Sequence, residues 1–210
     1  KGTYLDIFNL VIIAILIALT AFFVASEFAI IRIRSSRIDQ LIEEGNSSAV
    51  TSKRVISNLD EYLSACQLGI TITALGLGWL GESTFEKILH PIFERLNIPE
   101  SFNQVLSVGF AFAAITFLHV VVGELAPKTL AIQKAEMITL VVSRPLVLFY
   151  KVMYPFIWLL NGSARITTKF FGLKPVSENE IAHTEEELRI ILSESYKSGE
   201  INQSEFKYVN

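Results

Sequence analysis

Residues 101–123 read SFNQVLSVGFAFAAITFLHVVVG and contain no Asp, Glu, Lys or Arg. A membrane-spanning helix needs about 20 predominantly apolar residues, so this stretch is long enough to cross a bilayer. Residues 7–26 and 62–81 form two further uncharged stretches of similar length. Charged residues make up only 19% of the chain, below the roughly 25% typical of soluble domains. The sequence therefore predicts an all-α membrane protein with three transmembrane helices.

The remaining composition excludes several other classes of protein. A net charge of −3 does not favour nucleic-acid binding. Cys66 is the only cysteine, so no intrachain disulfide can form, and we expect it to pack within the second span. The sequence shows no nucleophile–base pair, phosphate-binding loop or dinucleotide fingerprint, and we therefore do not expect an enzyme.

Lysine and arginine are unevenly distributed between the two loops that join the spans. The first loop, residues 32–61, contains five of them, whereas the second, residues 82–100, contains two. Because basic residues concentrate on the cytoplasmic side, we expect a multi-pass plasma-membrane protein with its N-terminus outside and its C-terminus in the cytoplasm. The outer segment 82–96 is expected to form a separate short amphipathic helix.

A fourth apolar segment, residues 137–161, is interrupted by Arg144 and Lys151 and by two prolines, Pro145 and Pro155. Charges in the middle of a span are costly, and prolines break helices. We therefore expect a broken juxtamembrane helix that lies along the inner membrane face as a belt. A true fourth span would instead place the C-terminus outside.

The chain changes character after about residue 174. Thr184 and Glu187 form a capping pattern that predicts the start of a short cytoplasmic helix. We expect a transmembrane domain over residues 1–175, followed by an acidic helical linker over residues 176–210 that leads to a missing cytoplasmic domain.

The carboxylate of Glu124 follows directly on the third uncharged stretch. Such a group at the end of an apolar, membrane-length segment is costly unless it is compensated, so it is a functional candidate. Pro127 lacks the N–H that would bond the carbonyl of Gly123 in a regular helix. A free carbonyl oxygen beside a carboxylate would suit a hard cation such as Mg²⁺.

The first span carries an acidic residue, Glu27, opposite a face of small residues. Glu27 lies on the side of Thr20, and two interpretations are open. It is either an interfacial carboxylate paired with a base such as Arg34, or a cation site or gate at the inner end of a pathway. Ser26 lies between the two faces. The small face suits close helix packing and comprises Ala14, Ala18, Ala21, Ala25 and Ala29.

Small and polar residues also recur at helical spacing on two faces of the second span. One interpretation is interhelical hydrogen bonding and close packing, with Gly76 and Gly78 as packing positions. The other is that Gln67 and Thr71 add neutral oxygens to a cation site whose charge comes from Glu124. The polar face comprises Ser64, Gln67, Thr71, Ala74 and Gly78, and the second face comprises Gly69, Thr73 and Gly76.

Further polar residues lie in the third span. His119 shares a helical face with Thr116 and Gly123, and we expect it to be a satisfied buried group rather than a ligand. With no cysteine or second histidine nearby, a zinc or copper site is not expected. Asn103, Gln104 and Ser107, at the outer end, are expected to lie at the membrane interface.

These motifs together resemble the transmembrane module of the CorC / cyclin-M (CNNM) family. The resemblance covers about residues 5–175 and is most specific at the Gly-Glu-x-x-Pro-Lys element. The matching stretches are FFVASEFA (22–29), LSACQLGIT (63–71), GLGWLGE (76–82) and VGELAPK (122–128).

The resemblance implies a homodimeric transporter, with three spans and a belt helix, that exports Mg²⁺ in exchange for Na⁺. The tail resembles the family's linker to a cytoplasmic pair of CBS domains, through which ATP would act. Two positions depart from the family pattern: Val24 stands where many members carry serine, and Thr71 where some carry asparagine. By resemblance, the Mg²⁺ ligands would be Ser26 and Glu27, Gln67 or Thr71, and Gly123 and Glu124.

An alternative function is a non-transporting dimeric anchor that places nucleotide-sensing CBS domains at the membrane. The carboxylate of Glu124 argues for transport, because a charge in an apolar segment serves no purpose in an anchor. A measurement of Mg²⁺ flux distinguishes the two functions.

Overall fold

The computed structural model describes residues 2–95, 99–172 and 193, and every regular element within them is helical. Four helical stretches are long and apolar enough to cross a membrane: residues 7–32, 59–95, 102–133 and 135–170. Residues 1–162 form one compact unit and the remainder a second, and the packing described below lies within the first unit. The predicted linker at 176–210 falls outside the described residues, apart from residue 193.

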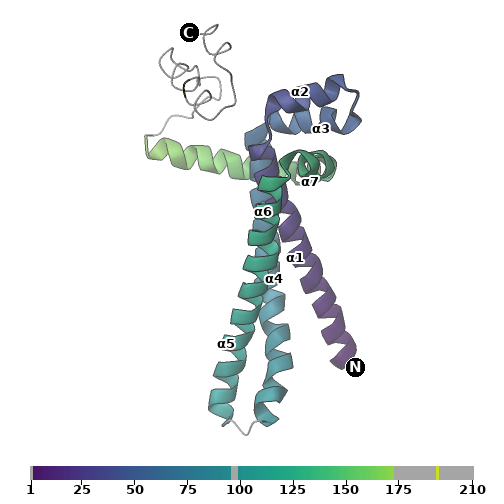
Figure 1. Ribbon diagram of the computed structural model, residues 1–210. Coiled ribbons are helices and arrows are strands. Elements are labelled where there is room, and N and C mark those ends of the chain that lie inside the picture. Colours follow the sequence, from purple (N-terminus) through teal and green to yellow (C-terminus); the bar gives the residue numbers. More distant parts are fainter. Residues whose placement is uncertain (1, 96–98, 173–192, 194–210) are drawn as a thin grey trace. The chain divides into compact units, whose positions relative to one another are not determined.

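Helix α1 (Gly2–Arg32) packs against α4 (Leu59–Arg95), as Figure 1 shows. The buried face of α1 is apolar at helical spacing and includes Ile13, Ile17, Thr20 and Val24. The alanine face is covered only toward the C-terminal end of α1: Ala14 and Ala18 are exposed, Ala21 and Ala25 are half-buried, and Ala29 is fully buried. Its role in close helix packing stays a prediction.

The second small face of α4 makes the close contact with α1. A methyl group at Gly69 would lie 2.6 Å from the ring of Phe23, so glycine is required for this approach. At Gly76 the same group would lie 3.5 Å from Leu16, an ordinary packing distance. Gly78, in contrast, has no atom within 4 Å of that position, so within the protomer only Gly76 of these two glycines lies against a neighbouring helix, and their packing role stays a prediction.

Helix α4 also continues through the segment that was expected to form a separate outer helix. It runs without a break to Arg95 and includes Pro91. Glu82, Glu86 and Lys87 do not interrupt it, because glutamate and lysine are good helix formers wherever water can reach them. In its C-terminal half α4 approaches the next helix closely at Gly81, where a methyl group would meet Ile115 at 2.5 Å.

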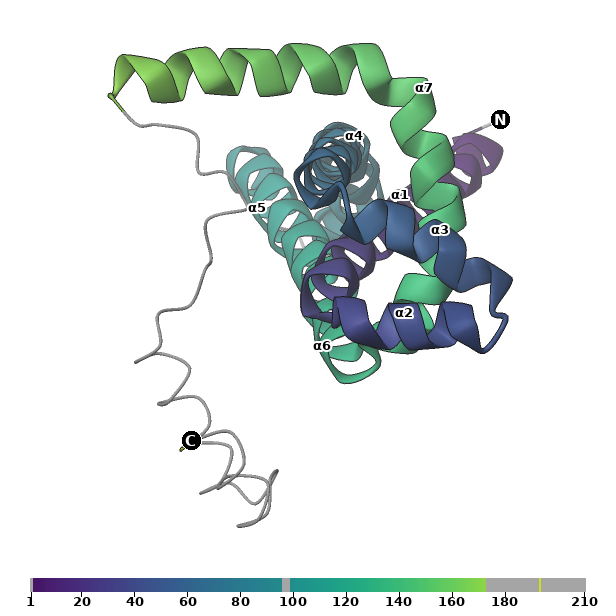
Figure 2. The ribbon, with the colours of Figure 1, turned by 90° about the horizontal axis from the view of Figure 1, so that it is seen from above.

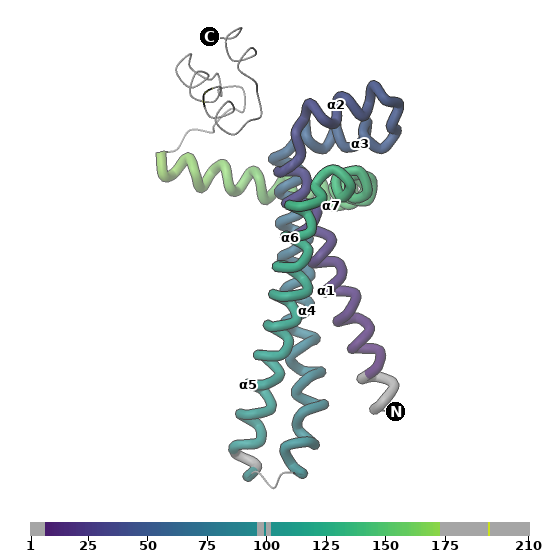
Figure 3. Tube along the Cα trace, in the orientation of Figure 1, coloured from purple at the N-terminus to yellow at the C-terminus, as the bar shows by residue number. Residues whose placement is uncertain are grey.

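The third span consists of three helical segments in line: α5 (Glu100–Leu118), η1 (His119–Leu125) and α6 (Ala126–Gln133). Figure 3 shows the trace passing through them without a break, antiparallel to α4. The middle segment, η1, is a π-helix, in which the N–H of Ala126 donates to the carbonyl of Val121, five residues earlier. Pro127 then lies in the first turn of α6, where a missing N–H is tolerated. The sequence analysis did not predict this π-helical segment.

Two short helices, α2 (Ser35–Glu43) and α3 (Ser47–Ile56), form a hairpin that follows α1. Its turn contains Gly45 with φ of 84°, a conformation that favours glycine. Lys53 and Asp39 join the two helices at 2.7 Å. The hairpin is bound to the fourth long helix through Arg37, whose guanidinium lies 2.9 Å from the carboxylate of Glu136.

Helix α7 (Ala135–Phe170) is continuous and contains both Pro145 and Pro155. The expectation that the prolines break it was wrong; Figure 2 shows that they lie in a helix that changes direction along its length. Figure 1 shows the first part of α7 running across the direction of α1, α4 and α5. Its length and composition would also allow a span, so the belt placement stays a prediction.

A large buried cluster joins α7 to the C-terminal half of α1 and the N-terminal half of α4. Leu146 and Ile157 of α7 pack there with Phe23, Tyr62 and Cys66. The expected packing role of the cysteine is confirmed, because its side chain is fully buried and free.

Candidate metal centre

Glu124 lies on the π-helical segment, with its side chain 43% exposed in the protomer. Its Oε1 is 3.4 Å from Nε2 of His119, and both residues belong to η1. The two atoms are not aligned for a hydrogen bond, and the buried Nε2 has no hydrogen-bond partner. The expectation that His119 is a satisfied buried group was therefore wrong, and the imidazole contacts the candidate ligand directly.

Three helices meet beside this pair, at Gly123. A methyl group at Gly123 would lie 3.4 Å from Thr20 of α1 and 3.2 Å from His119, so glycine permits the close approach. The hydroxyl of Thr20 lies 2.8 Å from that of Thr73 on α4, and both threonines are buried. This buried hydroxyl pair fixes α1 to α4 at the depth of the candidate site.

Thr20 and Thr73 were not among the predicted site residues. Thr73 does belong to the second small face of its span, and Glu27 was placed on the side of Thr20. What the sequence did not provide is the pairing of these two positions, which depends on how α1 and α4 are rotated about their axes.

The inner end of α1 carries the other predicted acidic ligand. Ser26 is fully buried and donates its hydroxyl proton to the carbonyl of Phe22 at 2.7 Å. Glu27 is half-buried and interacts electrostatically with Lys128. The ammonium of Lys128 also lies 4.6 Å from the ring centre of Phe28. No ion pair within the described residues joins Glu27 to Arg34 or to Lys128, so both interpretations of Glu27 stay predictions.

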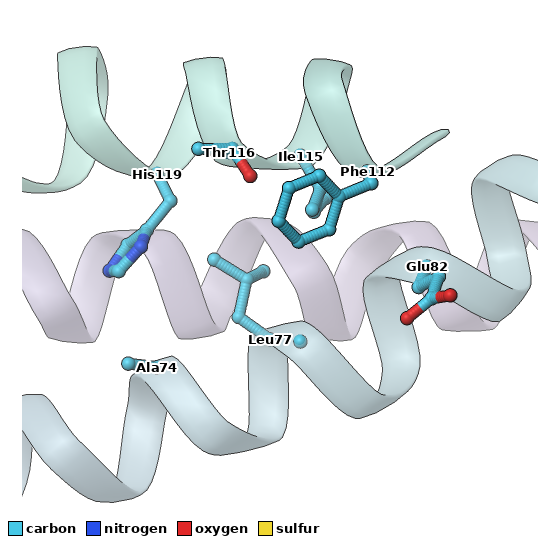
Figure 4. A pocket seen from close by; sticks show the side chains of 8 residues that line it. Ala74, Leu77, Glu82, Phe112, Ile115, Thr116 and His119 are labelled. Atoms are coloured by element: carbon cyan, nitrogen blue, oxygen red, sulfur yellow. The ribbon is translucent and has the colours of Figure 1, made fainter. Parts of the chain in front are cut away.

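The predicted ligands of the second span lie on an exposed face of α4. Gln67 and Thr71 are both exposed, and the Thr71 hydroxyl donates to the carbonyl of Gln67 at 2.8 Å. Farther along the same face, Ala74 lines a pocket together with His119 (Figure 4). Helices α4 and η1 run antiparallel. One turn along α4 from Ala74 back to Thr71 therefore leads in the same direction as the step along η1 from His119 to Glu124. Thr71 and Glu124 therefore lie at comparable depth.

The structure brings some of the predicted ligands together and leaves others apart. Gly123 and Glu124 meet beside His119, but no hydrogen bond or ion pair within the described residues joins Glu124 to Ser26, Glu27, Gln67 or Thr71. In the same part of the chain, no group of three or more His, Cys, Asp or Glu side chains could hold a metal ion. A cation at Glu124 would therefore depend on carbonyl, hydroxyl and amide oxygens for its remaining ligands, which suits Mg²⁺.

Polar residues also lie near the N-terminal end of α5. Asn103 and Ser107 are both fully buried, Gln104 is exposed, and the serine hydroxyl donates to the amide oxygen of Asn103 at 3.1 Å. The two buried side chains partly satisfy each other, which explains why they can face inward. The place of these residues at the membrane interface stays a prediction.

Several long apolar helices indicate a multi-helix membrane protein, and one of these stretches carries a carboxylate on a π-helical turn. The chain belongs to the family of the cyclin M transmembrane N-terminal domain, whose model matches residues 11–205. This confirms the resemblance drawn from the sequence motifs.

Several bacterial proteins are similar to this chain over nearly all of its length. UPF0053 protein YhdP of Bacillus subtilis is 70% identical over 206 residues, which are 98% of this chain and 46% of that protein. UPF0053 protein YrkA of the same organism is 67% identical over 96% of this chain and 46% of its own length. UPF0053 protein sll0260 of Synechocystis is 30% identical over 96% of this chain and 44% of its own length. The chain thus spans about half the length of these relatives.

Proposed function

We propose that this chain is the membrane part of a transporter for divalent cations, with Mg²⁺ as the substrate and Glu124 as the charged ligand. Transport is proposed to run outward and to be coupled to Na⁺. Membership of the cyclin M family supports the general class. The position of Glu124 supports the site.

One observation carries this proposal: Glu124 lacks a strongly basic partner. Elsewhere in the described residues, Glu136 is held by Arg37 and Asp39 by Lys53. Near Glu124 only His119 lies within ion-pair distance, and its imidazole is not aligned for a hydrogen bond. A carboxylate that is left without a fixed cation inside an apolar bundle is suited to receive a mobile one.

The surroundings of Glu124 provide oxygen atoms of the kind that Mg²⁺ prefers. The carbonyl of Gly123 adjoins the carboxylate, Thr71 lies at comparable depth on α4, and Gln67 follows one turn further along the same exposed face. Mg²⁺ keeps several of its waters when bound, so one carboxylate and a few neutral oxygens suffice. Ser26 and Glu27 would then form an inner station, with Lys128 exchanging for the arriving cation.

We further propose that the protein is a homodimer in the plasma membrane. Ala14 and Ala18 leave a small-residue face of α1 uncovered, and Gln67 and Thr71 leave a polar face of α4 uncovered. A second copy that covers these faces would remove polar groups from lipid. The N-terminus is proposed to lie outside and the C-terminus in the cytoplasm, where CBS domains outside this chain would bind ATP.

The test is Mg²⁺ flux into or out of proteoliposomes that contain the purified protein. Glu124→Gln removes the charge but keeps the size, and flux is expected to fall to the level of empty liposomes. The matched control is Glu43→Gln, which removes an exposed carboxylate on α2 and should leave flux unchanged. Normal flux from Glu124→Gln would overturn the site, and no flux from the unmodified protein would favour the anchor function.

Pro127→Ala tests the contribution of the backbone. The substitution restores an N–H at the junction of η1 and α6, which can then engage a carbonyl in the preceding turn. Mg²⁺ affinity, measured by calorimetry in detergent, is expected to fall. Unchanged affinity would remove the Gly123 carbonyl from the proposed ligands.

A further inference from the structure

A second polar feature lies on the outer side of Glu124, between α4 and α5. Here the two helices line a pocket of about 150 Å³ (Figure 4). This is room for several water molecules. Its lining includes Ala74, Gly78 and Glu82 of α4, with Phe112, Thr116 and His119 of the facing helix.

The pocket continues the polar face of α4. Gln67, Thr71, Ala74 and Gly78 recur at intervals of three and four residues, and Glu82 follows one turn later. All of these except Ala74 are exposed in the protomer. An exposed carboxylate and amide are costly against hydrocarbon, so this face is suited to water or to a second polar surface rather than to lipid.

Polar side chains of the facing helix also lie along this pocket. His119 lies between the Glu124 carboxylate, at 3.4 Å from Nε2, and the pocket that its ring also lines. Figure 4 shows Thr116 next along the helix and Glu82 at the end of the pocket opposite His119. In the described residues Glu82 has no ion-pair partner within 4 Å, so its charge is available to a cation.

We propose that this pocket is the outer release station for the cation that leaves Glu124, which rests the inference on the transport function proposed above. A cation with part of its water shell fits the volume, since Mg²⁺ retains several waters. Glu82 supplies the charge that attracts it, the Thr116 hydroxyl bonds its waters, and the His119 ring separates the station from Glu124.

Gly78 explains how the pocket stays open. No atom lies within 4 Å of the position that a side chain would first occupy there. Glycine is a poor helix former, and here no close contact requires it. Its effect at this position is to leave empty space in the wall of the pocket.

Gly78→Leu fills the pocket from this wall without a backbone clash. Gly162→Leu is the matched control, since Gly162 is another helical glycine with open space around it and does not line the pocket. We expect Gly78→Leu to lower Mg²⁺ flux in proteoliposomes at least about tenfold by blocking release. Mg²⁺ affinity in calorimetry should stay within about twofold, since the Glu124 site is untouched. Gly162→Leu should change neither quantity.

A second variant, Glu82→Gln, tests the station if Gly78→Leu does not fold. It should lower flux several-fold while leaving affinity unchanged, whereas Glu43→Gln should lower neither. Normal flux from both Gly78→Leu and Glu82→Gln would overturn the release station. The transport proposal has a separate failure, namely normal flux from Glu124→Gln, so the two outcomes can be told apart.

Discussion

Two glycines on α4, Gly69 and Gly78, serve opposite purposes. At Gly69 the helix touches α1 so closely that a methyl group would lie 2.6 Å from the Phe23 ring. At Gly78 there is nothing within 4 Å, and the residue lines a pocket. A glycine in a membrane helix can therefore lie at a very close helix contact or beside empty space. The sequence around the glycine does not show which of the two applies. Substitutions at the two positions should separate these roles.

The largest effect is expected at Gly69→Ala. The Phe23 ring cannot move aside, because it is held in the main buried cluster and lies 4.7 Å from the ring of Phe149. Overpacking of this kind costs about 1–3 kcal/mol. Equilibrium unfolding in mixed micelles should show the loss, and an unchanged unfolding free energy would mean that α1 and α4 separate easily.

Gly81→Ala should cost less, at about 1 kcal/mol, the lower end of the overpacking range. The methyl group would meet Cγ1 of Ile115 at 2.5 Å, but this side chain lies in a smaller buried cluster than that of Phe23. The same unfolding assay applies. A loss as large as that of Gly69→Ala would show that the α4–α5 contact is as rigid as the α1–α4 contact.

Gly78→Ala should have the opposite sign. The added methyl group enters free space, and alanine is favoured over glycine in a helix by about 0.8–1.0 kcal/mol. Stability in micelles should therefore rise by up to that amount. A decrease would show that the open wall of the pocket is closed in the folded protein.

Thr20→Val should have the smallest effect, because it removes the hydroxyl pair with Thr73 while keeping the side-chain shape. Interhelical hydrogen bonds in membrane proteins contribute about 0.6 kcal/mol on average. A double-mutant cycle with Thr73→Val measures the coupling. Strictly additive losses would show that the two hydroxyls do not interact.

The sequence predicted these long helices well because uncharged length is a local property. Residues 7–26, 62–81 and 101–123 all lie within long helices of the structure. The helix ends were less predictable. Helix α4 extends to Arg95 because charged helix formers such as Glu86 and Lys87 end an apolar run without ending a helix.

The faces of the helices were harder to predict than their existence. The alanine face of α1 and the Ile13–Ile17–Thr20–Val24 face both have helical spacing, and only the second is buried within the protomer. The spacing of residues shows which of them share a helix face, but not which other helix packs against that face. For the same reason the Thr20–Thr73 pair was not found, while Glu27, on the face of Thr20, was correctly placed opposite Ala18.

The candidate site was predicted in part. Glu124, Gly123 and Pro127 could be selected from the properties of single residues. Proline has no N–H, and a carboxylate is costly in an apolar segment. The π-helical turn was not predicted, because a local sequence pattern does not show whether each backbone N–H donates to the carbonyl four or five residues earlier. The contact between His119 and Glu124 depends on that choice.

The π-helical turn also limits how this helix can change in length. A turn that bonds five residues back holds one residue more than an α-helical turn with the same ends. Deleting one residue between 119 and 125 would let the turn become α-helical while α5 and α6 keep their present orientation. The same deletion within α5 would rotate every later residue by about 100° and carry Ala131 away from Ala29. The segment that bears the carboxylate is therefore where insertions and deletions should be absorbed.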